Sequence, residues 1–146
     1  MGEIQMENKF ELGQLIIRVV LGITFFIHGL DKFQGGVENT AGWFESIGIP
    51  GVVAYGVAVI ELVGGIMLVL GLFSRVVSIL FAVVMVGAIV KVKVAIGFLG
   101  NFQMAGYELD LAFLAMAVML AITGSKAFAL DQLIGKAKEN KTTSVN

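Results

Sequence analysis

Three side chains that can form hydrogen bonds and exchange protons lie together at the end of a long apolar run. The run ends in HGLDKF, where His28, Asp31 and Lys32 are three and four residues apart. On a helix, this spacing places all three side chains on one face. His28 is the only histidine of the chain, and imidazole changes charge near neutral pH without help from its surroundings. We therefore interpret these three residues as candidates for binding a carbonyl oxygen of a ligand or for handling protons.

The same residues do not suggest a metal site. The chain has no cysteine and one histidine, and one histidine with scattered carboxylates is a poor set of metal ligands. Iron–sulfur clusters need thiolates, and haem needs axial ligands that this chain does not offer as a convincing pair. We predict no metal, haem or iron–sulfur site. Any redox chemistry must then be borrowed from a quinone, a flavin or a partner protein.

Two further charges interrupt apolar runs. Arg18 lies inside the first run and Glu61 near the middle of the second. An ionisable residue inside a membrane costs about 2.5–3.5 kcal/mol and faces the protein interior unless it can reach the surface. Gly64 and Gly65 follow Glu61, and small residues let another helix approach closely, so Glu61 is predicted to face a neighbouring helix. We hypothesise that Arg18 pairs with Glu61. The alternatives are that Arg18 extends to the cytoplasmic headgroups and that Glu61 is protonated and bonded to backbone.

Charges also occur in pairs at the facing ends of the third and fourth runs. Lys91 and Lys93 end the third run, and Glu108 and Asp110 begin the fourth. A spacing of two places the members of each pair on nearly opposite sides of a helix. We predict that Lys91 and Glu108 face inward and that the other two face headgroups. The alternative is that all four are ordinary interfacial charges.

The elements that must position these residues are membrane-spanning helices. Of the 146 residues, 58% are hydrophobic and 14% are charged, against about 45–50% and about 25% in soluble domains. The net charge of −1 offers no basic surface for nucleic acid. Crossing a bilayer takes about 20 apolar residues, and four runs approach that length. They cover roughly residues 12–30, 52–72, 76–96 and 107–124.

These runs predict an all-α integral membrane protein, a bundle of four transmembrane helices. The runs lack the alternation of a membrane β-barrel. A single membrane domain would cover residues 12–125, between an N-terminal segment (1–11) and a polar tail (126–146) whose end has the composition of a disordered segment. Lysine and arginine favour the cytoplasmic side. This bias predicts a multi-pass protein of the bacterial cell membrane with both termini in the cytoplasm. The side predicted to be cytoplasmic holds Lys9, Arg75, Lys126, Lys136, Lys138 and Lys141, and the other holds Lys32, Lys91 and Lys93.

The first loop contains TAGWFESIGIP, which is typical of a short helix. Thr40 is expected to cap it, Trp43, Phe44 and Ile47 share one face, and Gly48 and Pro50 end it. Because tryptophan favours the headgroup zone, we expect this helix to lie on the outer leaflet. The alternative is a plain loop.

The ordered set of motifs resembles the DoxX family of small bacterial membrane proteins. The resemblance rests on RVVLGITFFIHGLDKF, VIELVGGIMLVLGLFSR and GYELDL and covers roughly residues 12–123. Within that family it looks closest to members linked with catechol and quinone stress in Gram-positive bacteria. It implies a membrane oxidoreductase, or a membrane subunit of a quinone-linked one, and some relatives are thought to act with soluble redox partners. The residues matching polar positions of the family are Arg18, His28, Lys32, Glu61 and Arg75.

Three functions remain open. The first is a redox component that binds a quinone in the bundle, with His28 and Lys32 bonded to its oxygens. The Arg18–Glu61 pair would then handle protons or hold the pocket open. The second is a non-enzymatic anchor or assembly partner for a soluble redox enzyme, with the polar tail as the docking point. The third is a transporter of small solutes or protons, for which a chain of four spans would need to form a homo-oligomer.

Overall fold

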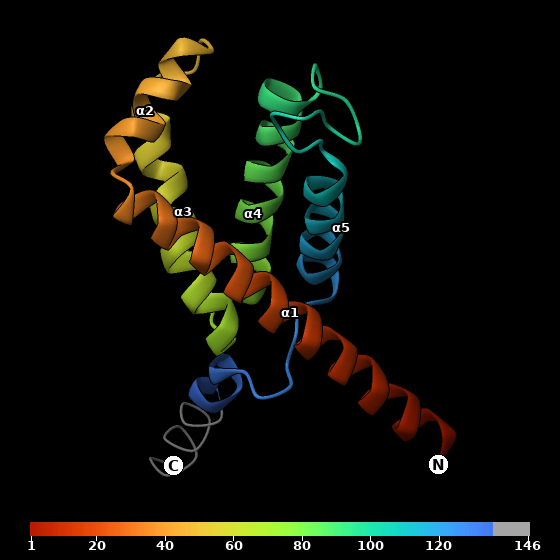
Figure 1. Cartoon of the computed structure of the whole chain (residues 1–146). Coiled ribbons are helices and arrows are strands. Elements are labelled where there is room, and N and C mark those ends of the chain that lie inside the picture. The colour runs from red at the N-terminus through yellow and green to blue at the C-terminus, as the bar shows by residue number, and fades with distance from the viewer. Residues whose placement is uncertain (136–146) are drawn as a thin grey trace.

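The computed structural model describes residues 1–135, and in that range the chain is mainly helical, with one long loop before the last of the long helices (Figure 1). In chain order these are α1 (Gly2–Gln34), α2 (Val37–Ser46), α3 (Val52–Leu70), α4 (Ser74–Ala88), the π-helical turn η1 (Ile89–Lys93) and α5 (Glu108–Thr123). This part of the chain contains no strand, only a single bridge between Gly100 and Ala105. The end of the predicted polar tail, with Lys136, Lys138 and Lys141, lies outside the described residues.

Three helical stretches are long and apolar enough to cross a membrane: α1, α3, and α4 continued by η1. They confirm the prediction of an all-α membrane protein. Helix α5 has 16 residues, about 24 Å at a rise of about 1.5 Å per residue. This is shorter than the hydrocarbon core of about 30 Å, so the fourth crossing stays a prediction.

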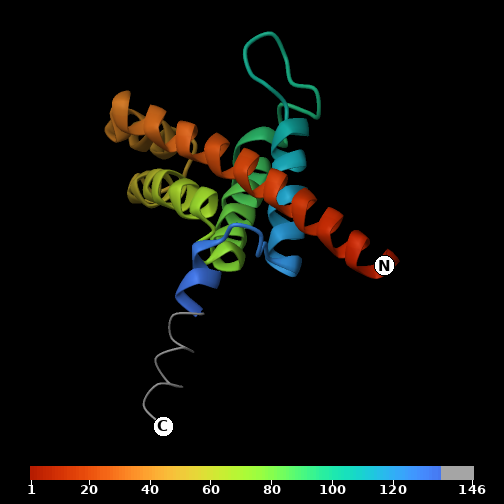
Figure 2. The ribbon, with the colours of Figure 1, turned by 90° about the horizontal axis from the view of Figure 1, so that it is seen from below.

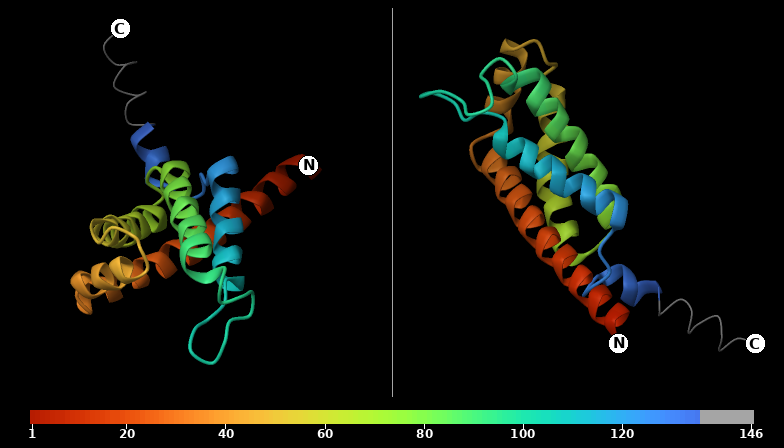
Figure 3. Two further views of the ribbon diagram at one scale, coloured as in Figure 1. Left: turned by 90° about the horizontal axis from the view of Figure 1, so that it is seen from above. Right: turned by 90° about the vertical axis from the view of Figure 1, so that its right-hand side faces the viewer.

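The helices form two antiparallel pairs, α1 with α3 and α4 with α5. Helix α1 runs obliquely across the other helices, and it contacts α5 as well as α3 (Figure 2). As oriented in Figure 1, the upper end of the bundle carries α2, η1 and the loop before α5. The lower end carries the start of α1, the turn between α3 and α4, and residues 124–135 (Figure 3). The names upper end and lower end are used below in this sense.

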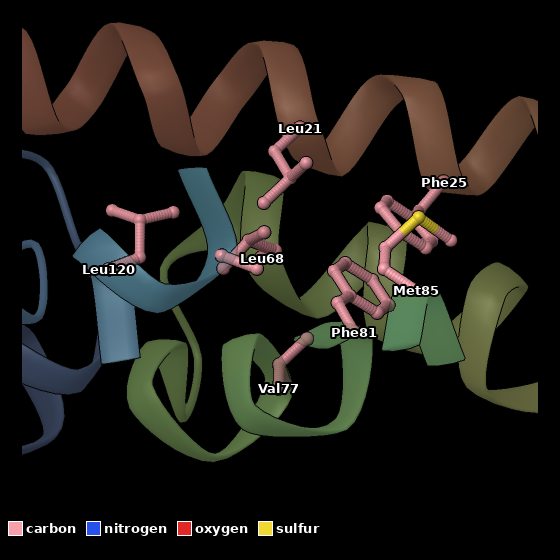
Figure 4. Packing of buried hydrophobic residues seen from close by; sticks show 8 residues of the cluster. Leu21, Phe25, Leu68, Val77, Phe81, Met85 and Leu120 are labelled. Atoms are coloured by element: carbon pink, nitrogen blue, oxygen red, sulfur yellow. The ribbon is translucent and has the colours of Figure 1, made fainter. Parts of the chain in front are cut away.

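One apolar core joins the two pairs. Each of the four long helices contributes buried side chains to it, and Figure 4 shows them meeting between the ribbons. The core consists of Leu21 and Phe25 from α1, Leu68 from α3, Val77, Phe81 and Met85 from α4, and Ala117 and Leu120 from α5. Because α1 contributes to this core and also packs along α3, it fixes one pair against the other.

The predicted short helix in the first loop is present as α2, but it begins earlier than expected. It starts at Val37 after Gly36, whose φ of 87° is readily adopted only by glycine. Thr40 therefore lies within the helix and does not cap it. Gly48, with φ of 81°, ends the helical stretch as predicted. Phe44 packs against a small core shared with α3, while Trp43 is half-exposed, and a position on the outer leaflet stays a prediction.

Candidate functional site

The middle of α3 holds a buried ion pair. Glu61 is the tenth residue of this 19-residue helix and is 5% exposed, as its predicted inward direction requires. Its Oε2 lies 2.6 Å from Nζ of Lys32, near the end of α1. Lys32 itself is only partly exposed. The pair places opposite charges between two helices, where the dielectric constant is low and their attraction is strong.

Glycines bring α1 close enough to α3 for this pair to form. A Cβ added to Gly29 would lie 2.7 Å from Cα of Leu62, so the two backbones touch at that point. A second close contact lies in the same interface, nearer the lower end. There a Cβ on Gly65 would lie 2.7 Å from the carbonyl oxygen of Gly22. Small residues at such crossings permit backbone approach in membranes. Lys32 follows Gly29 by three residues and so lies beside Glu61.

The hypothesis that Arg18 pairs with Glu61 is wrong. Gly29 lies opposite Glu61, and Arg18 precedes Gly29 by eleven residues, about 16 Å along the helix axis. The prediction failed because it aligned the ends of the two apolar runs. In the structure α1 continues to Gln34, and this places its C-terminal part beside the middle of α3.

Arg18 instead holds the lower end of the bundle together. Its Nη1 donates to the carbonyl oxygen and to Oγ of Ser125, and its Nη2 donates to the carbonyl oxygen of Phe128, each at 3.3 Å. The residue is 1% exposed, so the alternative of an arginine extended to headgroups is also wrong. Nearby, Asp131 Oδ2 accepts a hydrogen bond from the Phe73 N–H at 2.7 Å. Residues 124–135 are thereby bound to α1 and to the turn between α3 and α4.

A second Lys–carboxylate pair joins the other two helices. Nζ of Lys93, in η1, lies 2.5 Å from Oδ2 of Asp110, in the first turn of α5. Asp110 is 7% exposed, whereas Lys91 and Glu108 are exposed. The prediction that Lys91 and Glu108 face inward is therefore wrong. The other member of each pair, Lys93 or Asp110, faces inward. On α5 the reason is that Asp110 continues the stripe of side chains that includes the buried Ala117 and Leu120.

His28 and Asp31 lie at the surface, although the sequence groups them with Lys32 on one face. Of these three, Lys32 alone turns into the contact between α1 and α3. His28 lies one turn before Lys32 on α1 and is exposed. The structure therefore brings together Lys32 and Glu61, with His28 one turn away along α1.

Both ion pairs lie above one aromatic cluster. Phe25 of α1 stacks on Phe81 of α4, with centroids 3.8 Å apart and planes 7° from parallel. The ring of Phe113, on α5, lies 6.2 Å from that of Phe25. Gly29 follows Phe25 by one turn, and Asp110 precedes Phe113 by about one turn. Each of the two helix pairs therefore has one Lys–carboxylate pair, and both lie nearer the upper end than the aromatic cluster that the helix pairs share.

Two shallow grooves of the surface lie elsewhere. A shallow groove of about 380 Å³ runs between α4 and α5, and a second of about 230 Å³ lies between α1 and α3. Both are lined by apolar side chains and include no candidate residue. Within residues 1–135, no group of three or more histidine or acidic side chains is placed to hold a metal ion.

Comparison with known proteins identifies relatives along nearly the whole chain. The model of the family described as DoxX matches residues 13–94. A protein of Bacillus subtilis named "Putative oxidoreductase CatD" is 45% identical over 139 residues, which cover 95% of this chain and 99% of that protein. An uncharacterized membrane protein of Mycobacterium tuberculosis is 33% identical, covering 84% of this chain and 81% of its own. The inner membrane protein YqjF of Escherichia coli is 26% identical, covering 90% and 98%. No solved structure matches the chain significantly.

Proposed function

The chain belongs to the DoxX family of membrane proteins, and on that basis we propose that it is the membrane component of a quinone-linked oxidoreductase. A quinone-type molecule binds in the upper half of the bundle. The observation that carries this proposal is the buried Lys32–Glu61 pair above the aromatic cluster. The relative from B. subtilis, similar over its whole length, has oxidoreductase in its name.

The chemistry of these side chains suits a quinone. Reduction of a quinone to a hydroquinone consumes two electrons and two protons. The Lys32 ammonium can donate a hydrogen bond to a quinone oxygen, and charge-assisted bonds of this kind are strong. Glu61 can hold or release a proton, and His28, exposed one turn away, can exchange it with the surface. The electrons come from a bound cofactor or a soluble redox partner, because the chain has no cysteine.

The proposal also includes the arrangement of the chain in the membrane. α5 makes a fourth crossing, the domain spans residues 12–125, and both termini lie in the cytoplasm of a bacterial cell. The upper end then faces outward. A green fluorescent protein fused to the C-terminus should fluoresce, because it folds in the cytoplasm. A well-expressed fusion without fluorescence would contradict this orientation.

The first test of quinone binding uses protein purified in mild detergent. We expect its organic extract to contain a stoichiometric quinone by mass spectrometry, and the ultraviolet spectrum of the protein to change on reduction. Glu61→Gln, which keeps the shape of the side chain, should lose the quinone. The matched control is Glu108→Gln, because Glu108 is an exposed carboxylate at the same end and its change should leave binding intact. If the wild-type protein binds no added quinone in either redox state, the proposal fails.

A second candidate function is an anchor for a soluble redox enzyme. The observation in its favour is the lower end, where Phe128 is 90% exposed and Leu133 is 63% exposed on a segment held by Arg18. Crosslinking in intact cells from Phe128 and Leu133 should then capture a soluble oxidoreductase. An empty result with well-expressed protein would count against it.

A further inference from the structure

The loop between η1 and α5 has an unusual composition for a segment that leaves a membrane helix. Residues 94–107 contain no Asp, Glu, Lys or Arg. Leu99 is 75% exposed and Phe102 is fully exposed, and Phe98 and Met104 are about half-exposed. Large apolar side chains exposed together in one loop usually mark contact with lipid or with another protein.

The loop is held in a defined hairpin. Gly100 and Ala105 form a bridge. The N–H of Asn101 donates to the Met104 carbonyl oxygen at 2.8 Å. Oδ1 of Asn101 accepts from the N–H groups of Gln103 and Met104 at 2.9 Å each. The exposure of Leu99 and Phe102 is therefore built into a structured turn, which we call the upper hairpin (residues 97–107).

The lengths of the neighbouring helices set the level of the upper hairpin. The stretch α4–η1 has 20 residues, about 30 Å, and α5 has 16, about 24 Å. Helix α5 is therefore shorter by about one helical turn, and the residues that precede α5 lie at the level of that missing turn. Tyr107 lies there and meets the ring of Phe98 edge-on, with centroids 5.4 Å apart. Tyrosine at the boundary between the lipid acyl chains and the headgroups is typical of membrane proteins.

We propose that the upper hairpin inserts into the lipid headgroup region beside the bundle, with Leu99 and Phe102 reaching the start of the acyl chains. Figure 3 shows the loop extending sideways from the bundle instead of folding over it. Helix α2, at the same end, differs in that its exposed residues include Glu38 and Glu45. The partner of the hairpin is therefore the bilayer, and this inference does not depend on what the bundle binds.

The test exploits a chain without cysteine. Single substitutions Phe102→Cys and Leu99→Cys receive an environment-sensitive fluorophore, and the protein is reconstituted in vesicles of phosphatidylcholine and phosphatidylglycerol. Lipids carry a nitroxide either near the headgroup or near the chain end, and iodide serves as the aqueous quencher. Glu45→Cys on α2 is the matched control at the same end.

We expect the shallow nitroxide to quench the fluorophore at 99 and 102 several-fold more than the deep one, with little quenching by iodide. The label at 45 should show strong iodide quenching. Iodide quenching at 102 as strong as at 45 would place the hairpin in water and overturn the proposal. Protection of the label at 102 from the lipid nitroxides and from iodide would mean that protein covers it. A disulfide between two Phe102→Cys chains would then identify a second copy as the partner, and the proposal would be wrong.

Discussion

The two Lys–carboxylate pairs join equivalent helix pairs but rest on different local structures. Glu61 lies in the middle of α3, where the backbone N–H groups are bonded within the helix, and its ion-pair partner is Lys32. Asp110 lies in the first turn of α5, where free N–H groups and the helix dipole favour a negative charge. A carboxylate at a helix start is therefore less dependent on its lysine than one at mid-helix. The first pair depends on close helix contact, and the second is partly supported by position.

The largest expected effect follows from removing the cation of the first pair. Lys32→Met should lower the free energy of unfolding by about 3–5 kcal/mol, because it leaves a buried carboxylate without its partner. Chemical unfolding in detergent micelles measures this change. The double variant Lys32→Met with Glu61→Gln should recover much of the loss. A single variant as stable as wild type would show that Glu61 does not need Lys32.

The next effect tests the contact that allows the first pair to form. Gly29→Ala should destabilise the protein by about 1–3 kcal/mol, because the added methyl group overlaps the backbone of α3. Gly56→Ala is the control, because a Cβ there meets nothing within 4 Å, and it should be neutral or slightly stabilising. Equal stability of the two variants would remove the argument from backbone approach.

A smaller effect is expected at the second pair. Lys93→Met should cost about 1.5–3 kcal/mol, the cost of a lost hydrogen bond to a charged group, because the helix start still supports Asp110. The same unfolding measurement applies, with Lys91→Met as the exposed control. A loss equal to that of Lys32→Met would mean that helix position gives Asp110 no support.

The smallest effect is predicted for Asp110→Asn. Asparagine keeps the shape and can still accept hydrogen bonds near a helix start, so the loss should be about 0.5–1 kcal/mol. Unfolding at low and at high salt would separate the charge from the shape. A loss above that of Lys93→Met would reverse the order that the comparison predicts.

The sequence predicts part of this arrangement. The length and composition of the apolar runs predict the helices, because a hydrophobic stretch is a property of the chain alone. The burial of Glu61 also follows, since a short carboxylate in mid-span cannot reach water. Its partner does not follow, because the partner depends on how far α1 is displaced along α3. That displacement is set by the contacts of Gly22 and Gly29 with the facing helix.

The second pair could not be predicted for another reason. Lys91 and Lys93 differ by two positions, and which of them faces inward depends on the local winding of the helix. The π-helical turn over Ile89–Lys93 changes that winding, and nothing in IVKVK marks it. On α5, the stripe formed by Phe113, Ala117 and Leu120 was available in the sequence and would have selected Asp110.

The contacts of Arg18 have a consequence for the time course of synthesis. Its hydrogen-bond acceptor Ser125 follows it by 107 residues. At about 5–20 residues per second, Arg18 is added to the chain about 5–20 s before that acceptor. During this interval the guanidinium needs water, headgroups or the insertion machinery as a temporary partner. The hydrogen bonds of Arg18 can therefore form only after the last segment of the domain has been translated.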